Sequence, residues 1–256
     1  MYALDAYIVL TFKGEHIMVV TSTPASSGSS RSPASSRQWW RHPWLALLAA
    51  LVAGFLIFSV PPYLTLRPEL SRIPAPPAYP WYYSVLAGHV WFASVAMVAS
   101  CLQIWPWLRN RHHRVHRWTG RVYVFCGALP AGVLGLAIAF ISPTGLPVRV
   151  SNVVLASLWL AVTVIGYRRA RQRRYGEHRE WMVRGFALTM SILATRVVGL
   201  AWVLALLPEL DTTYGGSVEA LTKAASAAAG PTGWLACLLA AEWHLRRRSP
   251  DRARNR

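Results

Sequence analysis

The stretch YYSVLAGHVWFASVAMVASCLQIW, residues 82–105, contains no Asp, Glu, Lys or Arg. A helix rises about 1.5 Å per residue, so a stretch of this length can cross a hydrocarbon core of about 30 Å. It therefore predicts a membrane-spanning helix, and five further apolar stretches of similar length predict others. The six predicted spans are residues 44–60, 81–105, 118–141, 150–167, 181–207 and about 228–245.

The composition of the whole chain favours an all-α integral membrane protein over a nucleic-acid-binding protein. Although the net charge is +17, hydrophobic residues make up 54% of the 256 residues and only 14% are charged. The charge lies in clusters between apolar runs. These charged clusters are too short to form a DNA-reading module. The three cysteines, at 101, 126 and 237, all lie in apolar runs without zinc-site spacing, so we expect buried thiols.

The basic residues alternate between the connections of the predicted spans. Of the 27 Lys and Arg residues, 22 lie in the N-terminal tail, the second-to-third connection, the fourth-to-fifth connection or the C-terminal tail. Cytoplasmic segments are enriched in Lys and Arg. The pattern predicts six spans with both termini in the cytoplasm, and we expect the basic segments to contact anionic lipids.

The two ends of the chain lie outside the predicted bundle of residues 44–245. Residues 1–43 are predicted to be a disordered cytoplasmic tail, because TSTPASSGSSRSPASSR (21–37) has too few apolar residues to form a core. Met18 is an alternative to Met1 as the start of translation. Residues 246–256 are a basic cytoplasmic tail. An Arg- and Ala-rich, Lys-poor composition is typical of a high-GC bacterium, so we expect the bacterial plasma membrane.

Two ionisable residues lie deep in predicted spans. His89 is about 12 Å from the outer end of its span and Arg196 about 18 Å from the outer end of its own. Because a charge in hydrocarbon is costly, such residues face a bundle interior or a wet cavity. We expect both to line one pocket in the outer half of the membrane. Small and polar residues at helical spacing after His89, the last of them Gln103, lie on the same helix face, which suits a face turned toward other helices. The alternative is that both only hydrogen-bond neighbouring helices.

Two similar basic motifs open the third and fifth spans, HRWTGRVYV (116–124) and HREWMVRGFAL (178–188). Their position at the inner face predicts an anion-binding region, with candidate ligand-binding residues Arg117, Arg121, Arg184 and Glu242. Either Arg121 or Arg184 can pair with Glu242. His116 and His178 lie at one predicted depth, so they are candidate axial ligands of a haem b iron.

These residues, in order, resemble a bacterial family of predicted membrane proteins, domain of unknown function 2306 (DUF2306), over about residues 80–245. The resemblance implies a multi-pass membrane protein and no assigned reaction. The positions that it carries over are His89, Gln103, His116, Arg117, Gly120, Arg121, Tyr123, His178, Arg179, Trp181, Met182, Arg184, Arg196 and Glu242.

Three functions remain open from the sequence. The leading hypothesis is an intramembrane site for a small ligand or cofactor, in its specific form a haem b electron carrier. The second is a transporter or channel component for a small or anionic solute, and the third a structural membrane protein without a ligand. No serine-nucleophile, HExxH or phosphate-loop motif indicates an enzyme.

Overall fold

The computed structural model describes residues 9–12, 15–18, 43–73 and 75–248, which divide into two units, Met1–Gln38 and Trp39–Arg256. In the first unit, strands β1 (Val9–Phe12) and β2 (Glu15–Met18) pair antiparallel, with Val9 opposite Met18. This strand pair lies within the tail that the sequence predicts to be disordered. The Ser-, Pro- and Ala-rich part of that tail lies outside the described residues, and so does residue 249 onward.

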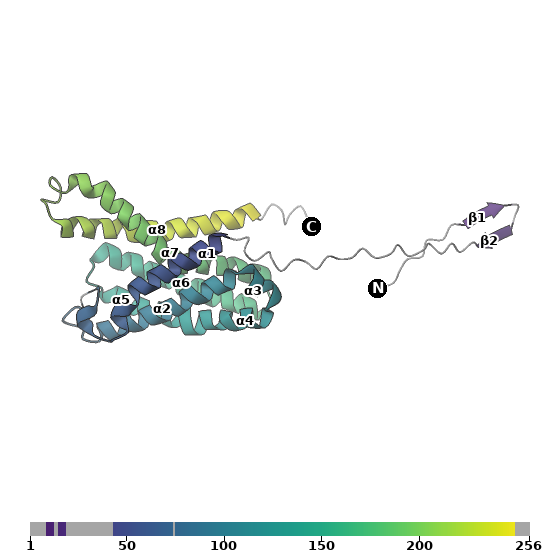
Figure 1. Ribbon diagram of the computed structural model, residues 1–256, viewed down its shortest axis with the longest axis horizontal. Coiled ribbons are helices and arrows are strands. Elements are labelled where there is room, and N and C mark those ends of the chain that lie inside the picture. The colour runs from purple at the N-terminus through teal and green to yellow at the C-terminus, as the bar shows by residue number, and fades with distance from the viewer. Residues whose placement is uncertain (1–8, 13–14, 19–42, 74, 249–256) are drawn as a thin grey trace. The chain divides into compact units, whose positions relative to one another are not determined.

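The described part of the second unit is all helical (Figure 1). Its helices are α1 (Pro43–Ser59), α2 (Tyr82–Ile104), α3 (Pro106–Arg111), α4 (His113–Arg121), α5 (Leu129–Ile141), α6 (Leu146–Arg171), α7 (Tyr175–Leu206) and α8 (Val218–Arg248). The 3-10 turns η2 (Pro61–Tyr63), η3 (Pro68–Leu70) and η5 (Leu207–Glu209) lie in the connections, and the π-helical segment η4 (Val122–Ala128) joins α4 to α5.

Among the described residues, five helical stretches are long and apolar enough to cross a membrane. They are Tyr82–Ile104, His113–Ile141, Leu146–Arg171, Tyr175–Glu209 and Val218–Arg247. The first predicted span corresponds to α1, which is apolar but has only 17 residues. Several helices extend beyond the predicted apolar segments because a helix continues into polar residues once it leaves the hydrocarbon.

The third predicted span changes its hydrogen-bonding pattern near its middle. In η4 the backbone N–H of Leu129 donates to the carbonyl of Val124, five residues earlier. Pro130 follows immediately and has no N–H to donate, so it cannot continue the ordinary α-helical ladder backward. The π-helical segment thus accommodates the proline while α4, η4 and α5 remain one stretch that is long and apolar enough to cross a membrane.

Small residues let the helices of the core approach closely. A Cβ built on Gly127 of η4 would lie 2.9 Å from Cα and Cβ of Ala96 in α2, and one on Gly132 would lie 2.6 Å from Leu160 of α6. Around these contacts the buried core contains Ala96, Ala99, Tyr123, Val124, Ala128, Ala131, Trp159, Val162, Leu188 and Trp234. Such close backbone contact is how helices associate where lipid gives no hydrophobic driving force.

Large apolar side chains cover much of the outside of the helical unit. Ile57, Val197 and Leu239 are 76%, 71% and 67% exposed. Soluble monomers rarely expose apolar surface on this scale. The exposed side chains fit a surface that is covered by acyl chains.

The close contact at Gly127 yields a stability prediction. We expect Gly127→Ala to lower the free energy of unfolding by about 1–3 kcal/mol, because the new methyl group would collide with the backbone of Ala96. Thermal unfolding of the purified protein in detergent measures the effect. Gly54→Ala in α1 is the matched control, because nothing lies within 4 Å of its Cβ position. Equal stability of the two variants would contradict the packing described here.

Candidate functional site: the basic end of the helical unit

Three basic segments meet at one end of the helical unit, which we call the basic end. They are α3 with α4, the turn between α6 and α7, and the last turns of α8, and the first and last of these lie at the same end in Figure 1. The side chains of Arg117 and Arg121 are exposed there and make no hydrogen bond or ion pair with any described residue. The structure therefore does not bring these two arginines together with the other candidate residues.

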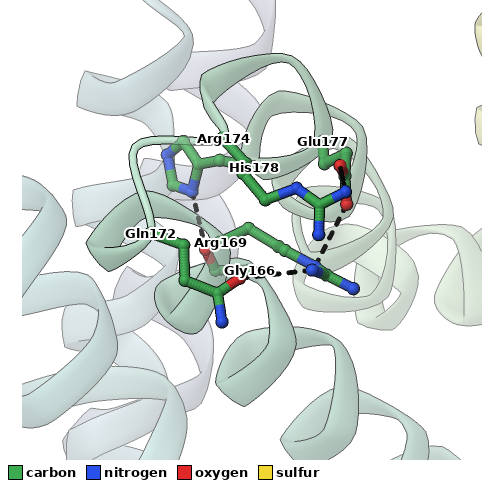
Figure 2. A network of polar contacts seen from close by, with 6 residues as sticks. All are labelled: Gly166, Arg169, Gln172, Arg174, Glu177 and His178. Carbon is green, nitrogen blue, oxygen red and sulfur yellow. Dashed lines mark hydrogen bonds and ion pairs between the residues drawn. The ribbon is translucent and has the colours of Figure 1, made fainter.

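One carboxylate organises the turn between α6 and α7 (Figure 2). Glu177 contacts Arg169 Nε at 3.1 Å and Arg174 at 2.6 Å, and Arg169 also donates to Gln172 at 3.2 Å. These groups are exposed enough that we expect each pair to add little stability. Together they fix the geometry of the turn, and sequence reasoning missed Glu177. Its signal is that it is the first of two acidic residues, with Glu180, after a run of arginines.

His178 is held by the preceding helix. Its Nδ1 donates to the carbonyl oxygen of Gly166 in α6 at 2.8 Å, also drawn in Figure 2. A side chain at position 166 would disturb this packing, because a Cβ there would lie 2.3 Å from the Met182 methyl carbon and 3.3 Å from Trp181. Because a carbonyl oxygen can only accept a hydrogen bond, Nδ1 of His178 carries the proton. Nε2 of His178 has no hydrogen-bond partner among the described residues.

His116 differs from His178 because its Nδ1 is buried and has no hydrogen-bond partner in the described part of the chain. Arg109, His113 and His178 lie within electrostatic range of its ring. A buried polar atom without a partner costs about 1–3 kcal/mol, and such atoms in native structures point to a water, an ion or a ligand. Among the candidate residues, His116 is therefore the one with a buried ring nitrogen that no described residue hydrogen-bonds.

Gln103 fixes the start of the helix that carries His116. Its Nε2 donates to the His116 carbonyl at 2.8 Å and to Thr119 Oγ1 at 2.5 Å. The neighbouring Gly120 lies against the Gln103 amide, since a Cβ there would lie 3.4 Å from Gln103 Oε1, at contact distance. Gln103 thus acts on the candidate site by positioning α4.

Arg184 and Glu242 join α7 to α8 in a two-pronged ion pair. Arg184 donates through Nε to Oε1 and through Nη2 to Oε2, the second at 3.1 Å, and its guanidinium lies over the Trp181 ring at 4.8 Å. The two side chains are only 21% and 32% exposed. Of the two arginines expected as partners of Glu242, the structure thus selects Arg184 over Arg121.

His89 and Arg196 do not share a pocket in the structure. His89 Nδ1 donates to the carbonyl of Ala131 in α5 at 2.8 Å, and its ring packs against Gly135, where a Cβ would lie 2.8 Å away. Arg196 is exposed on α7 and makes no hydrogen bond or ion pair with any described residue. His89 thus follows the alternative of an interhelical hydrogen bond, and Arg196 follows neither expectation.

A buried polar cluster in the middle of the bundle connects three helical segments. Thr189 donates to the Gly185 carbonyl at 2.8 Å, and its oxygen accepts from Tyr123 and from Trp159 Nε1, each at 3.0 Å. Nearby in α6, the side chain of Thr163 is fully buried. Sequence reasoning named Tyr123 only through the family resemblance.

The two histidines at the basic end satisfy the requirements of a bis-histidine haem only in part. An axial histidine commonly donates its second ring nitrogen to a carbonyl, as His178 does to Gly166. His116 has no such orienting bond, and α6 and α7 touch at Gly166. The structure therefore does not support the haem expectation.

Comparison with known proteins identifies one family. The sequence model of a family described as predicted membrane protein (DUF2306) matches residues 86–221. This stretch includes both basic motifs, His89 and Arg196, and it ends before Glu242. No curated protein and no solved structure matches the chain.

The Arg184–Glu242 pair yields a stability prediction. We expect Glu242→Gln to lower the free energy of unfolding by roughly 2 kcal/mol, because it leaves a largely buried guanidinium without a counter-charge. Glu177→Gln, which affects more exposed pairs, should cost at most about 1 kcal/mol. Chemical denaturation in mixed micelles compares the two. The pair would be unimportant if both variants unfolded alike, whereas the charge-reversed double variant of Arg184 and Glu242 should recover part of the loss.

Proposed function

The chain belongs to the DUF2306 family of predicted membrane proteins, and we propose that it binds a small polar ligand at the basic end, beside His116 and His178. The observation that carries this proposal is the buried Nδ1 of His116, which no described residue satisfies. Gln103 holds the backbone of His116 in place, and His178 is held by Gly166. Two imidazoles in fixed positions, with unused nitrogen atoms, favour a ligand that offers both hydrogen-bond donors and acceptors.

Most other polar residues near the two histidines already have partners within the protein, which makes them less suited to bind the ligand. Glu177, Arg184 and Glu242 are already engaged in ion pairs, and Gln103 in two hydrogen bonds. Their contacts hold the helices together and leave little capacity for a ligand. Recognition of the ligand would therefore depend on the two histidines, with Arg109 and His113 supplying positive charge nearby.

The proposed topology has six spans, with both termini in the cytoplasm of a bacterial cell and the bundle in its plasma membrane. The alternation of basic connections supports it. The 17 residues of α1 extend about 26 Å, near the lower limit for a span, and the exposed Leu47, Ile57 and Phe58 suit contact with acyl chains. In this orientation the ligand reaches the basic end from the cytoplasm.

The same orientation makes anionic lipids partners of the basic end. Trp107 and Trp118 are exposed on α3 and α4, among five arginines between positions 109 and 121. Indole rings prefer the level of the lipid headgroups, and arginines near that level attract anionic lipids. The short α3 and α4 would therefore lie at the inner surface of the membrane.

Cysteine labelling tests the topology. In a variant whose three native cysteines are replaced by alanine, a membrane-impermeant maleimide should label Arg67→Cys and Tyr214→Cys in intact cells. Arg173→Cys and Gln38→Cys should react only after the membrane is permeabilised. Reaction of Gln38→Cys and Arg67→Cys from the same side would show that α1 does not cross and would leave five spans.

Mass spectrometry with visible absorption tests the ligand. Full-length protein purified in mild detergent should carry a small-molecule adduct that His116→Ala loses or binds about tenfold or more weakly, because one hydrogen bond to a buried ring is lost. His244→Ala, which removes an exposed histidine near the end of α8, should keep the adduct.

The spectrum separates the outcomes. A Soret band that disappears in both His116→Ala and His178→Ala would identify the ligand as haem, whereas an adduct without visible absorption would identify another small molecule. Wild-type protein without any adduct, together with lowered stability of His116→Ala, would reject the proposal in favour of a structural role.

A further inference from the structure

The exposed cation in the middle of α7 is not explained by the fold. Arg196 lies within the candidate span Tyr175–Glu209, ten residues before the end of α7 at Leu206 and 21 after its start at Tyr175. These separations correspond to about 15 Å and about 32 Å. A guanidinium at such a depth costs several kcal/mol unless a counter-charge or water reaches it.

The position of Arg196 follows from the periodicity of α7. His178, Thr189 and Arg196 lie on one face, at spacings of eleven and seven residues. This face is buried against the core at Thr189 and is exposed at Arg196. The face of α7 that carries His178, Thr189 and Arg196 is therefore covered by other helices at Thr189 but not at Arg196. Arg196 faces the surroundings of the protein.

The described part of the helical unit offers no counter-charge at this level. In the described part of the helical unit, Glu177 and Glu180 lie in the first turns of α7 and Glu242 in the last turns of α8. The other four carboxylates, Glu69, Glu209, Asp211 and Glu219, lie in the connections or in the first turn of α8. A second copy of the chain would bring the same carboxylates at the same depths. Pairing between copies therefore does not neutralise Arg196.

The side chains around Arg196 point to lipid as its environment. Val197, Leu200 and Leu204 are 71%, 61% and 59% exposed on the same half of α7. Acyl chains cover aliphatic surface of this kind. A phosphate has the geometry to accept two parallel hydrogen bonds from a guanidinium.

We propose that Arg196 binds the phosphate of an anionic phospholipid, whose acyl chains cover the aliphatic face formed by Val197, Leu200 and Leu204. The arginine side chain extends toward the end of α7 at Leu206, and the headgroup is drawn inward to meet it, so the bilayer is thinner beside this helix. The site is independent of the ligand proposed at the basic end.

Photo-cross-linking tests the lipid site. Full-length protein is reconstituted in phosphatidylcholine vesicles with a minor fraction of phosphatidylglycerol that carries a photoactivatable acyl chain. Peptide mass spectrometry should place cross-links on residues 197–204. Their yield should fall about tenfold in Arg196→Met and much less in Arg196→Lys, because lysine retains the charge. Arg67→Met, which removes one positive charge from a connection, is the matched control and should not change the yield.

Thermal unfolding accompanies each variant. Arg196→Met should fold, because the residue has no partner in the described structure to lose, and it should no longer gain stability from phosphatidylglycerol. Unchanged cross-linking in Arg196→Met would overturn the proposal. So would displacement of the lipid by inorganic phosphate, which would indicate a soluble anion, or cross-links from residue 197 to a second polypeptide, which would indicate a protein interface.

Discussion

A polar side chain inside a membrane has no water to bind, so it must find its partner on a neighbouring helix. In this chain three polar side chains of α7 have such partners: Arg184 and Thr189 within the predicted span 181–207, and His178 just before it. A different neighbour satisfies each of them. His178 bonds the Gly166 carbonyl of α6, Arg184 pairs with Glu242 of α8, and Thr189 accepts hydrogen bonds from η4 and α6. α6, α8 and η4 are thus each fixed against α7.

Glycine makes these polar contacts possible at close range. Gly120 faces Gln103, Gly135 faces His89 and Gly185 faces Tyr123, with a built Cβ 3.4, 2.8 and 3.3 Å from the nearest polar side-chain atom or ring. A side chain would collide with the His89 ring at position 135 and would make a tight contact with Tyr123 at position 185, whereas at position 120 the contact with Gln103 would be of ordinary length. The glycines therefore determine which polar groups can bond across helices, and the bonds in turn fix the relative position of the helices.

Hydropathy and charge alone predicted where the helices lie, because an apolar run long enough to cross a bilayer has few alternatives. They did not predict that α7 begins at Tyr175 rather than at 181, since a helix continues outside the hydrocarbon without an apolar signal. The motifs indicated Glu242 and two possible partners, and only the three-dimensional arrangement selected Arg184. The spacing of seven residues places Thr189 on the face of Arg196, but it does not indicate that Thr189 bonds Tyr123 and Trp159, because those partners lie on other helices.

The contacts also separate residues that the fold explains from those that it does not. The polar side chains of Gln103, Arg184 and Glu242 are used in the fold, so stability alone accounts for them. His116 and Arg196 have polar groups that no described residue satisfies. They lie at different levels, because His178, the α7 residue in electrostatic range of His116, is 18 residues or about 27 Å from Arg196. A single small ligand cannot bridge that distance, so the two groups require separate partners, one at the basic end and one within the bilayer.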